Sequence, residues 1–177
     1  TWPLASLAKV PLALSVLAAA RAGRVDAGQR LSLIPGHGTV PAAVGAGQLE
    51  HVATVALVDA LYLAVSLSDT VAAEALLDLV PWTEGTALLR ELGLRDTFLR
   101  SRFAELTQTP AEQMTDTPEL AQVIASSAAL ASGGHRLPAL DRSRTNTSTA
   151  RDLATVLGAA WDPRDTPLHS DDARHLR

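Results

Sequence analysis

Long apolar runs separated by short polar breaks fill the first half of the chain. Such runs are typical of helices that are buried on most of their surface. The pattern predicts a helix over 6–22, a short strand over 30–34 and further helices over 54–67, 70–80 and 83–92. Gly23, Pro81 and Gly93 stand just after three of these helices, where glycine and proline commonly end a helix.

The second half of the chain is more polar and less regular. The mixed and polar sequence of 94–114 predicts a loop with short turns. The Thr-Pro-Glu sequence at 117–119 predicts the start of a helix that runs to 132. A capping pattern at Thr149 and Asp152 predicts another helix, to about 161, and 170–177 predicts the start of one more. Because no repeat or linker divides the chain, we expect a single domain over 1–177.

Composition favours a mainly α fold, since Leu and Ala dominate and only 3% of the residues are aromatic. A net charge of -4 without a basic run argues against a nucleic-acid partner. The absence of cysteine excludes disulfides, thiolate metal sites and a cysteine nucleophile. The histidines share no ligand spacing, so we expect no metal and no cofactor. The apolar stretch 10–20 is too short to span a bilayer.

Lysine is used once in the chain. Of the 15 basic residues, only Lys9 is a lysine, and all the others are arginine. Arginine stays charged at any working pH, whereas a buried lysine can change its pKa and exchange protons. The lone lysine therefore suggests proton chemistry at position 9, although drift would also leave a single lysine in some chains.

Lys9 belongs to a Ser-x-x-Lys motif with Ser6. Positions i and i+3 share one face of a helix, so the amine can come within reach of the hydroxyl. A serine hydroxyl becomes a good nucleophile when a base removes its proton, and a desolvated lysine can serve as that base. The alternative is that Ser6 is a helix N-cap and Lys9 a surface charge.

A second polar motif, Ser68-Asp69-Thr70, begins 62 residues after Ser6, between two predicted apolar helices. A turn of this composition is also an ordinary way to cap the following helix. Helix capping explains Asp69 and Thr70 well, but it explains neither the separation from Ser6 nor the surrounding sequence.

These surroundings resemble class A serine β-lactamases and the related penicillin-binding proteins. Residues 3–10 are similar to the nucleophile helix of that family, and 66–77 to its S-D-N motif followed by A-x-x-L-L. Leu92-Gly93 resembles the helix end before the family's omega loop, and 144–157 the segment and helix after it. The resemblance covers most of the chain in order.

The resemblance implies the helical domain of the serine β-lactamase and DD-peptidase-like α+β fold, with the sheet segments largely missing from this chain. A β-lactam, a D-alanyl peptide or an ester would acylate Ser6. Lys9 would help to deprotonate Ser6, and Ser68 would pass a proton to the leaving nitrogen. Asp69 and Thr70 would contact substrate. The resemblance also implies a location outside the cytoplasm; no oligomeric state follows from it.

The chain departs from the family pattern at three places. Thr70 replaces the asparagine of the second motif. The omega-loop acid is displaced, because Glu105 follows Arg102 by three residues where the family has two. Residues 107–140 resemble an insertion, and no K-T-G motif follows, so we expect the chain to stop before that strand.

Three interpretations follow from these features. The leading one is a serine hydrolase that is acylated at Ser6 and deacylates slowly, with Glu105 as the candidate acid for water activation. The alternative is a catalytically weak or inactive relative that uses the same pocket as a binding module. A helical structural protein with a chance Ser-x-x-Lys motif is the third.

Overall fold

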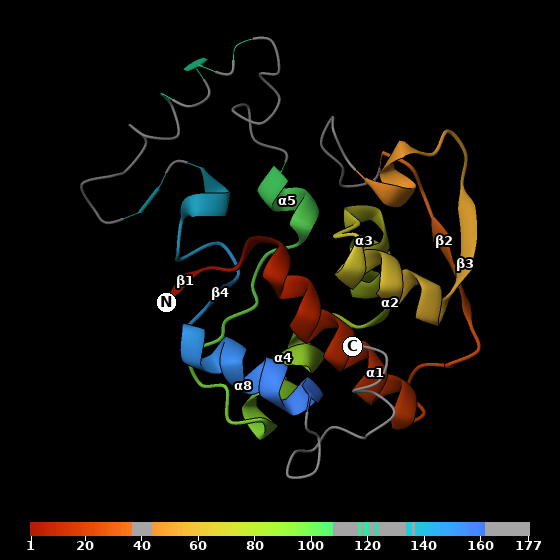
Figure 1. Ribbon diagram of the computed structural model, residues 1–177, viewed down its shortest axis with the longest axis horizontal. Coiled ribbons are helices and arrows are strands. Elements are labelled where there is room, and N and C mark those ends of the chain that lie inside the picture. The colour runs from red at the N-terminus through yellow and green to blue at the C-terminus, as the bar shows by residue number, and fades with distance from the viewer. Residues whose placement is uncertain are drawn as a thin grey trace.

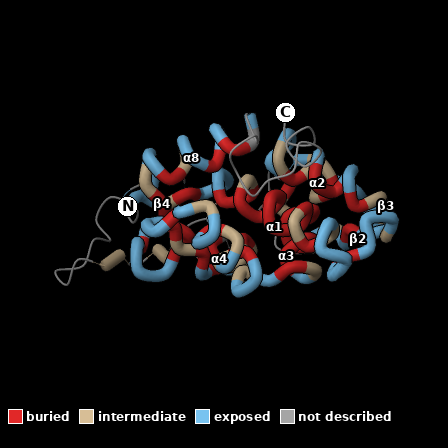
Figure 2. The backbone as a smooth tube through the Cα atoms, turned by 90° about the horizontal axis from the view of Figure 1, so that it is seen from below, coloured by how far each residue is buried: buried red, intermediate tan, exposed pale blue. Residues whose placement is uncertain are grey.

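Helix α1 (Lys9–Arg21) lies at the centre of the computed structural model, and the other helices pack around it (Figure 1). The structure describes residues 1–36, 44–107 and 137–161, together with 117, 119, 120, 123, 134 and 135. Most side chains of α1 are buried, and Figure 2 shows this helix as a buried segment inside more exposed neighbours. A helix that is apolar all round needs cover on every side, and α1 receives it here.

Three helices pack directly on α1, namely α2 (Leu57–Ser66), α3 (Thr70–Leu79) and α4 (Trp82–Glu91). The short helix α5 (Phe103–Thr107) packs on α3, and α8 (Ala150–Trp161) adds Val156 and Ala159 to the same core. The prediction of a mainly helical chain is confirmed. The predicted cap of the last helix is also present, because the Asp152 amide donates to Thr149 Oγ1 at 3.1 Å.

A two-stranded antiparallel sheet flanks α2 and α3. Strand β2 (Arg30–Leu33) pairs with β3 (Ala53–Ala56), with Arg30 opposite Ala56 and Leu33 opposite Ala53. The prediction of a helix from residue 54 is therefore wrong at its start, since the helix begins at Leu57. The backbone of 53–56 is extended because it pairs with a strand more than twenty residues earlier, which a local apolar pattern does not reveal.

A second short sheet fixes the chain just before Ser6. Strand β1 (Trp2–Pro3) pairs with β4 (Thr147–Ser148), and the next amide, of Leu4, donates to the Asn146 carbonyl at 2.8 Å. The side chain of Asn146 is buried, and its Oδ1 accepts hydrogen bonds from the backbone N–H groups of Arg100 at 2.7 Å and Ser101 at 3.1 Å. The chain just before Ser6 and the segment before α5 are thus joined through Asn146.

Some predicted features lie outside the described residues. The helix over 170–177 does so entirely, and the helix over 117–132 and the insertion over 107–140 do so largely. The insertion and the single domain over 1–177 therefore remain predictions. The one-turn 3₁₀ helices η1 (Ala5–Ala8), η2 (Gly45–Gln48) and η3 (Pro138–Leu140) complete the elements that position the site.

Candidate active site

Ser6 stands one residue after a strained turn at the start of the central helix. The chain passes from buried Leu4 through Ala5, whose φ is +46°, into η1, and η1 leads directly into α1. A positive φ costs a residue with a Cβ about 1 kcal/mol or more, so the surrounding contacts must hold this turn. The Ser6 side chain is exposed, and its hydroxyl forms no hydrogen bond within the described part of the chain. It is open to an incoming group.

Lys9 is the first residue of α1, and it is only 2% exposed. Its amine donates to the Ser68 carbonyl oxygen, to Ser68 Oγ at 3.2 Å and to Thr70 Oγ1 at 3.3 Å. The centroid of the Phe103 ring lies 5.3 Å from the same nitrogen. Because an ammonium has three N–H donors, these three oxygens fix its position.

Burial lowers the pKa of the Lys9 amine from 10.5 to about 8. The negative charges of Asp69 and Glu74 act in the opposite direction and keep the pKa from falling further. At a pKa of about 8, roughly one amine in ten is neutral at pH 7 and can accept a proton. This is the property that a base for Ser6 needs.

Ser68 alone links α2 to α3, since Leu67 closes the first helix and Asp69 caps the second. Its φ of +57° places it in the left-handed region, which turns the chain sharply between the helices. The side chain of Ser68 is exposed, and the Asp69 amide donates back to the Leu63 carbonyl at 3.0 Å. The turn therefore presents the Ser68 hydroxyl outward, toward Lys9.

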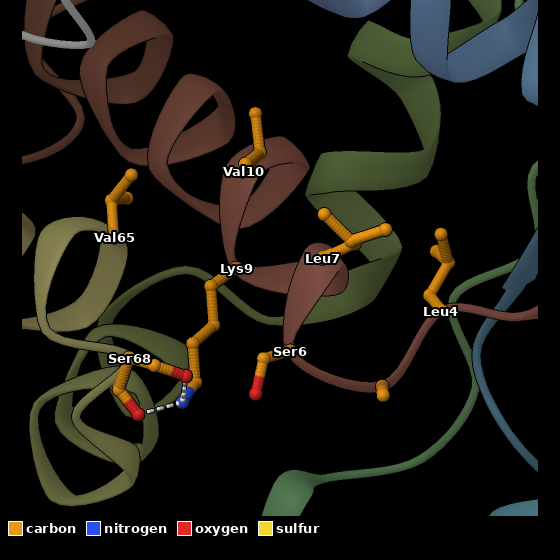
Figure 3. A pocket seen from close by; sticks show the side chains of 8 residues that line it. Leu4, Ser6, Leu7, Lys9, Val10, Val65 and Ser68 are labelled. Atoms are coloured by element: carbon orange, nitrogen blue, oxygen red, sulfur yellow. Dashed lines mark hydrogen bonds between the residues drawn. The ribbon is translucent and has the colours of Figure 1, made fainter. Parts of the chain in front are cut away.

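Ser6, Lys9 and Ser68 line one pocket of about 410 Å³. Figure 3 shows their polar ends directed into the same space: Ser6 comes from η1, Lys9 from the first residue of α1, and Ser68 from the α2–α3 turn. The remaining lining is apolar and consists of Leu4, Ala5, Leu7, Val10 and Val65. The pocket combines a free hydroxyl, an amine with a lowered pKa and a second hydroxyl within an apolar wall.

The Asp69 carboxylate lies in the interior and ties two elements together. Its side chain is fully buried, and its carboxylate accepts from the amides of Ala46 at 2.6 Å and Ala72 at 3.1 Å. A Cβ on Gly45, whose φ is +65°, would collide with Asp69 Oδ2. The carboxylate thus joins η2 to the start of α3, and contact of Asp69 with substrate remains a prediction.

Thr70 lies beside the amine rather than in the pocket lining. Its hydroxyl is 3.3 Å from Lys9 Nζ, so it helps to hold the amine. A role for Thr70 in binding substrate remains a prediction.

Glu105 lies on α5 with an exposed side chain and does not line the pocket of Ser6. Its carboxylate accepts from the backbone N–H of Arg102 at 3.3 Å, as a residue in the first turn of a helix often does. Ala104 occupies the position two residues after Arg102. The role of Glu105 in water activation remains a prediction, and its observed contact is with the start of its own helix.

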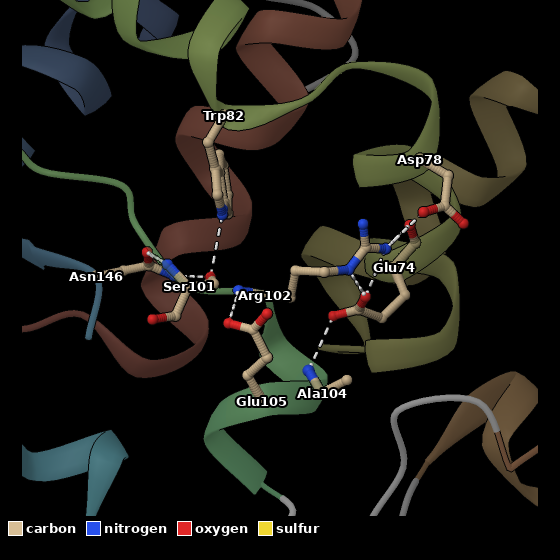
Figure 4. A network of polar contacts seen from close by, with 8 residues as sticks. All are labelled: Glu74, Asp78, Trp82, Ser101, Arg102, Ala104, Glu105 and Asn146. Carbon is tan, nitrogen blue, oxygen red and sulfur yellow. Dashed lines mark hydrogen bonds and ion pairs between the residues drawn. The ribbon is translucent and has the colours of Figure 1, made fainter. Parts of the chain in front are cut away.

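The sequence interpretation missed a network around Glu74, which Figure 4 shows. Glu74 is fully buried on α3 and binds both Arg102 and the amide of Ala104. The available signal was its spacing, because Glu74 follows Thr70 by four residues and so shares a helix face with it. An acid on the buried face of an apolar helix needs a partner, and that partner lies 28 residues away.

The described residues contain no group of three His, Asp or Glu side chains that could hold a metal ion. Within the same residues, no helix has the length and apolar character needed to cross a membrane.

Comparisons with known proteins agree with this geometry. A model of the family described as "Beta-lactamase enzyme family" matches residues 1–174. A β-lactamase regulatory protein, BlaB of Streptomyces cacaoi, is 42% identical over 162 residues, which are 91% of this chain and 52% of that protein. The chain thus spans about half the length of this relative.

Solved structures show the same fold. A β-lactamase from Sphaerobacter thermophilus matches with a TM-score of 0.69 and 20% identity, covering 99% of this chain and 53% of that one. The penicillin-binding protein PBP-A matches with a TM-score of 0.66 and 20% identity, covering 99% of this chain and 52% of that one. A β-lactamase from Francisella tularensis has a TM-score of 0.67 at 15% identity, with 99% and 54% covered. The chain matches the helical part of this fold.

Proposed function

Because the chain belongs to the β-lactamase enzyme family, we propose that Ser6 is acylated by a β-lactam, a D-alanyl peptide or a related ester. The observation that carries this proposal is the pocket that joins three side chains: the free hydroxyl of Ser6, the amine of Lys9 and the hydroxyl of Ser68. The family also supports action outside the cytoplasm.

In the proposed reaction, the neutral Lys9 amine removes the proton of the Ser6 hydroxyl, and the Ser6 oxygen bonds to the carbonyl carbon of the ligand. The proton then passes to the Ser68 hydroxyl, which lies 3.2 Å from the amine. Ser68 delivers a proton to the leaving nitrogen, or to the leaving oxygen of an ester, as the bond to the carbonyl carbon breaks. The product is an ester on Ser6.

Intact-mass measurement of the protein with and without penicillin G tests this proposal. We expect an increase by one ligand mass, which the Ser6→Ala variant does not show. The matched control is Ser66→Ala, an exposed serine at the end of α2 outside the pocket lining, which should acquire the same mass as the parent. A parent protein that gains no mass at any ligand concentration would refute acylation.

We further propose that the ester is released slowly. Two observations support slow release: Ala104 stands two residues after Arg102, where the family pattern has the water-activating acid, and the next residue, Glu105, contacts the start of its own helix. A misplacement of about 1 Å can cost on the order of a hundredfold in rate. A chromogenic β-lactam should show a burst of about one equivalent and then little turnover. Sustained turnover near the roughly 10 per second typical of enzymes contradicts slow release.

A binding module is the second candidate function. It is favoured by the relative from Streptomyces cacaoi, whose name describes a regulatory protein and not an enzyme. A protein of this kind would hold the same ligand in the pocket of Ser6 without a covalent bond. Penicillin G would then raise the melting temperature of the parent and of Ser6→Ala alike while the mass of both stays unchanged. Covalent adduct formation on the parent alone favours the first candidate.

A further inference from the structure

The Glu74 carboxylate binds two residues at the start of α5, namely Arg102 just before the helix and Ala104 within it. Its Oε2 accepts from Arg102 Nε at 2.7 Å, and its Oε1 accepts from the Ala104 amide at 2.9 Å. Arg102 also reaches the Glu74 carbonyl at 3.3 Å and the exposed Asp78 carboxylate at 2.6 Å. Both carboxylate oxygens of Glu74 are therefore bound, as a fully buried carboxylate requires.

The residue between those two contact points is Phe103. Its side chain is buried, its ring centroid is 5.3 Å from Lys9 Nζ, and it packs edge-on against Trp82 with centroids 6.0 Å apart. A ring at this distance from an ammonium contributes a favourable cation–π contact and also excludes water from the amine. The position of this ring therefore affects the environment of Lys9.

We propose that Glu74 is a positioning residue that, by binding both neighbours of Phe103, holds this ring against the Lys9 amine. The proposal rests on the proposed function in one respect, because Glu74 affects the reaction only if Lys9 is the base for Ser6. Glu74 itself touches neither Ser6 nor the ligand pocket.

The charge of Glu74 has a second effect on the amine. The charged groups that act on the Lys9 amine directly are Asp69, the N-cap of α3, and Glu74 on α3. Around them lie Asp78 on α3, its partner Arg102 just before α5, and the exposed Glu105 on α5. The negative charge of Glu74 raises the pKa of Lys9 and partly offsets the lowering caused by burial. Loss of this charge also leaves Arg102 without its buried partner. Both changes disfavour the ammonium, so the pKa should fall.

The single lysine of the chain allows a direct test without catalysis. Lysine labelled with ¹³C at the ε position gives one NMR signal from the full chain, because Lys9 is the only lysine. Titration of that signal reports the pKa of Lys9, and the chemical shift of the attached protons reports the nearby Phe103 ring. Phe103→Leu provides the reference spectrum for an amine without the ring.

Glu74→Gln keeps an oxygen acceptor for the Ala104 amide but loses the charge. We expect the Lys9 midpoint to fall by about half a unit or more, as for other charges near a titrating group. Glu74→Ala cuts both contacts, and the ε-proton shift should move toward its value in Phe103→Leu. The matched control is Asp78→Asn, which removes the exposed partner of Arg102 and should leave both quantities unchanged.

An ε-proton shift that stays at its parent value in Glu74→Ala overturns the proposal, because the ring would then keep its place without Glu74. An equal movement of the ε-proton shift in Asp78→Asn also overturns it. If Glu74→Ala does not fold, the ε-proton shift of Glu74→Gln decides the outcome, because a glutamine keeps only one acceptor oxygen for Arg102 and the Ala104 amide. The Lys9 midpoint in Glu74→Gln measures the separate effect of the charge. Failure of the proposed function has a different signature, since the parent would acquire no adduct mass while the titrations follow the expected pattern.

Discussion

Lys9 lies between two regions that are built in different ways. On one side, the α2–α3 turn supplies the oxygens of Ser68 and Thr70 directly to the amine. On the other side, the segment of 102–107 supplies an aromatic ring, and a buried acid on a different helix holds that segment in place. The first side supplies polar groups to the pocket of Ser6, whereas among the described residues the second side supplies no acid to that pocket. The contrast fits the proposal that an ester on Ser6 forms faster than it is released.

Among the variants considered, replacement of the Lys9 amine should have the largest effect on the rate of acylation of Ser6. Lys9→Arg keeps the charge but installs a bulkier group that does not give up its proton. Acylation of Ser6 should fall by about a hundredfold or more, the usual scale for the loss of a positioned base. The rate of adduct formation by mass spectrometry measures the effect.

The matched control for this variant is Arg21→Lys, the reverse exchange at the exposed end of the same helix. It should leave the rate of adduct formation unchanged. An unchanged rate in Lys9→Arg removes the amine from the mechanism.

The pH dependence of acylation gives the next largest effect. The proposed base is the neutral amine of Lys9, whose pKa is about 8. The neutral fraction therefore rises about fiftyfold between pH 6 and pH 8 and levels off above pH 8. Rates of adduct formation should follow this curve. A rate that is flat across this range would mean that another group takes the proton from Ser6.

The sequence could single out Ser6, Lys9 and Ser68, which line one pocket, because the pattern around each of them is local. The spacing of Ser6 and Lys9 sets one helix face, and the break between two apolar runs sets the position of Ser68. The opposite side depends on contacts between distant residues. Nothing near Glu74 in the sequence indicates that Arg102 is its partner, and strand β3 likewise depends on pairing with β2.

Asp69 shows the same limit for a residue that the sequence did single out. Its place in the motif predicts contact with substrate, but not that its buried carboxylate holds Ala46 in η2, 23 residues earlier. Residue type and local spacing identify a polar turn, but only the packed structure decides which of its side chains point outward.

The buried amine of Lys9 should also lower the stability of the fold. The pKa of Lys9 is lowered from 10.5 to about 8 in the fold, so the unfolded chain binds more protons between these values. Stability therefore rises with pH through this window, and the full penalty is present below pH 8. We expect Lys9→Met to stabilise the protein by about 2 kcal/mol at pH 7, less than the full linkage value because its hydrogen bonds are lost.

Urea unfolding at pH 7 and at pH 10 measures this cost. The advantage of Lys9→Met should shrink at the higher pH, because the folded amine is neutral at pH 10 and most of the burial penalty has been lost by then. A variant that is less stable than the parent at both pH values would show that the contacts of the amine outweigh its burial.

The smallest effect is expected on the opposite side, at Glu105. Its exposed carboxylate accepts from the Arg102 amide at 3.3 Å, and a glutamine can accept the same hydrogen bond. Glu105→Gln should therefore change the rates of acylation and of ester release by less than about twofold, a difference of less than about 0.5 kcal/mol. The control is Glu91→Gln, at the exposed end of α4. A tenfold slower release in Glu105→Gln alone, with the adduct accumulating, would identify Glu105 as the base that activates water. The side of the site that holds Phe103 would then serve catalysis as directly as the α2–α3 turn.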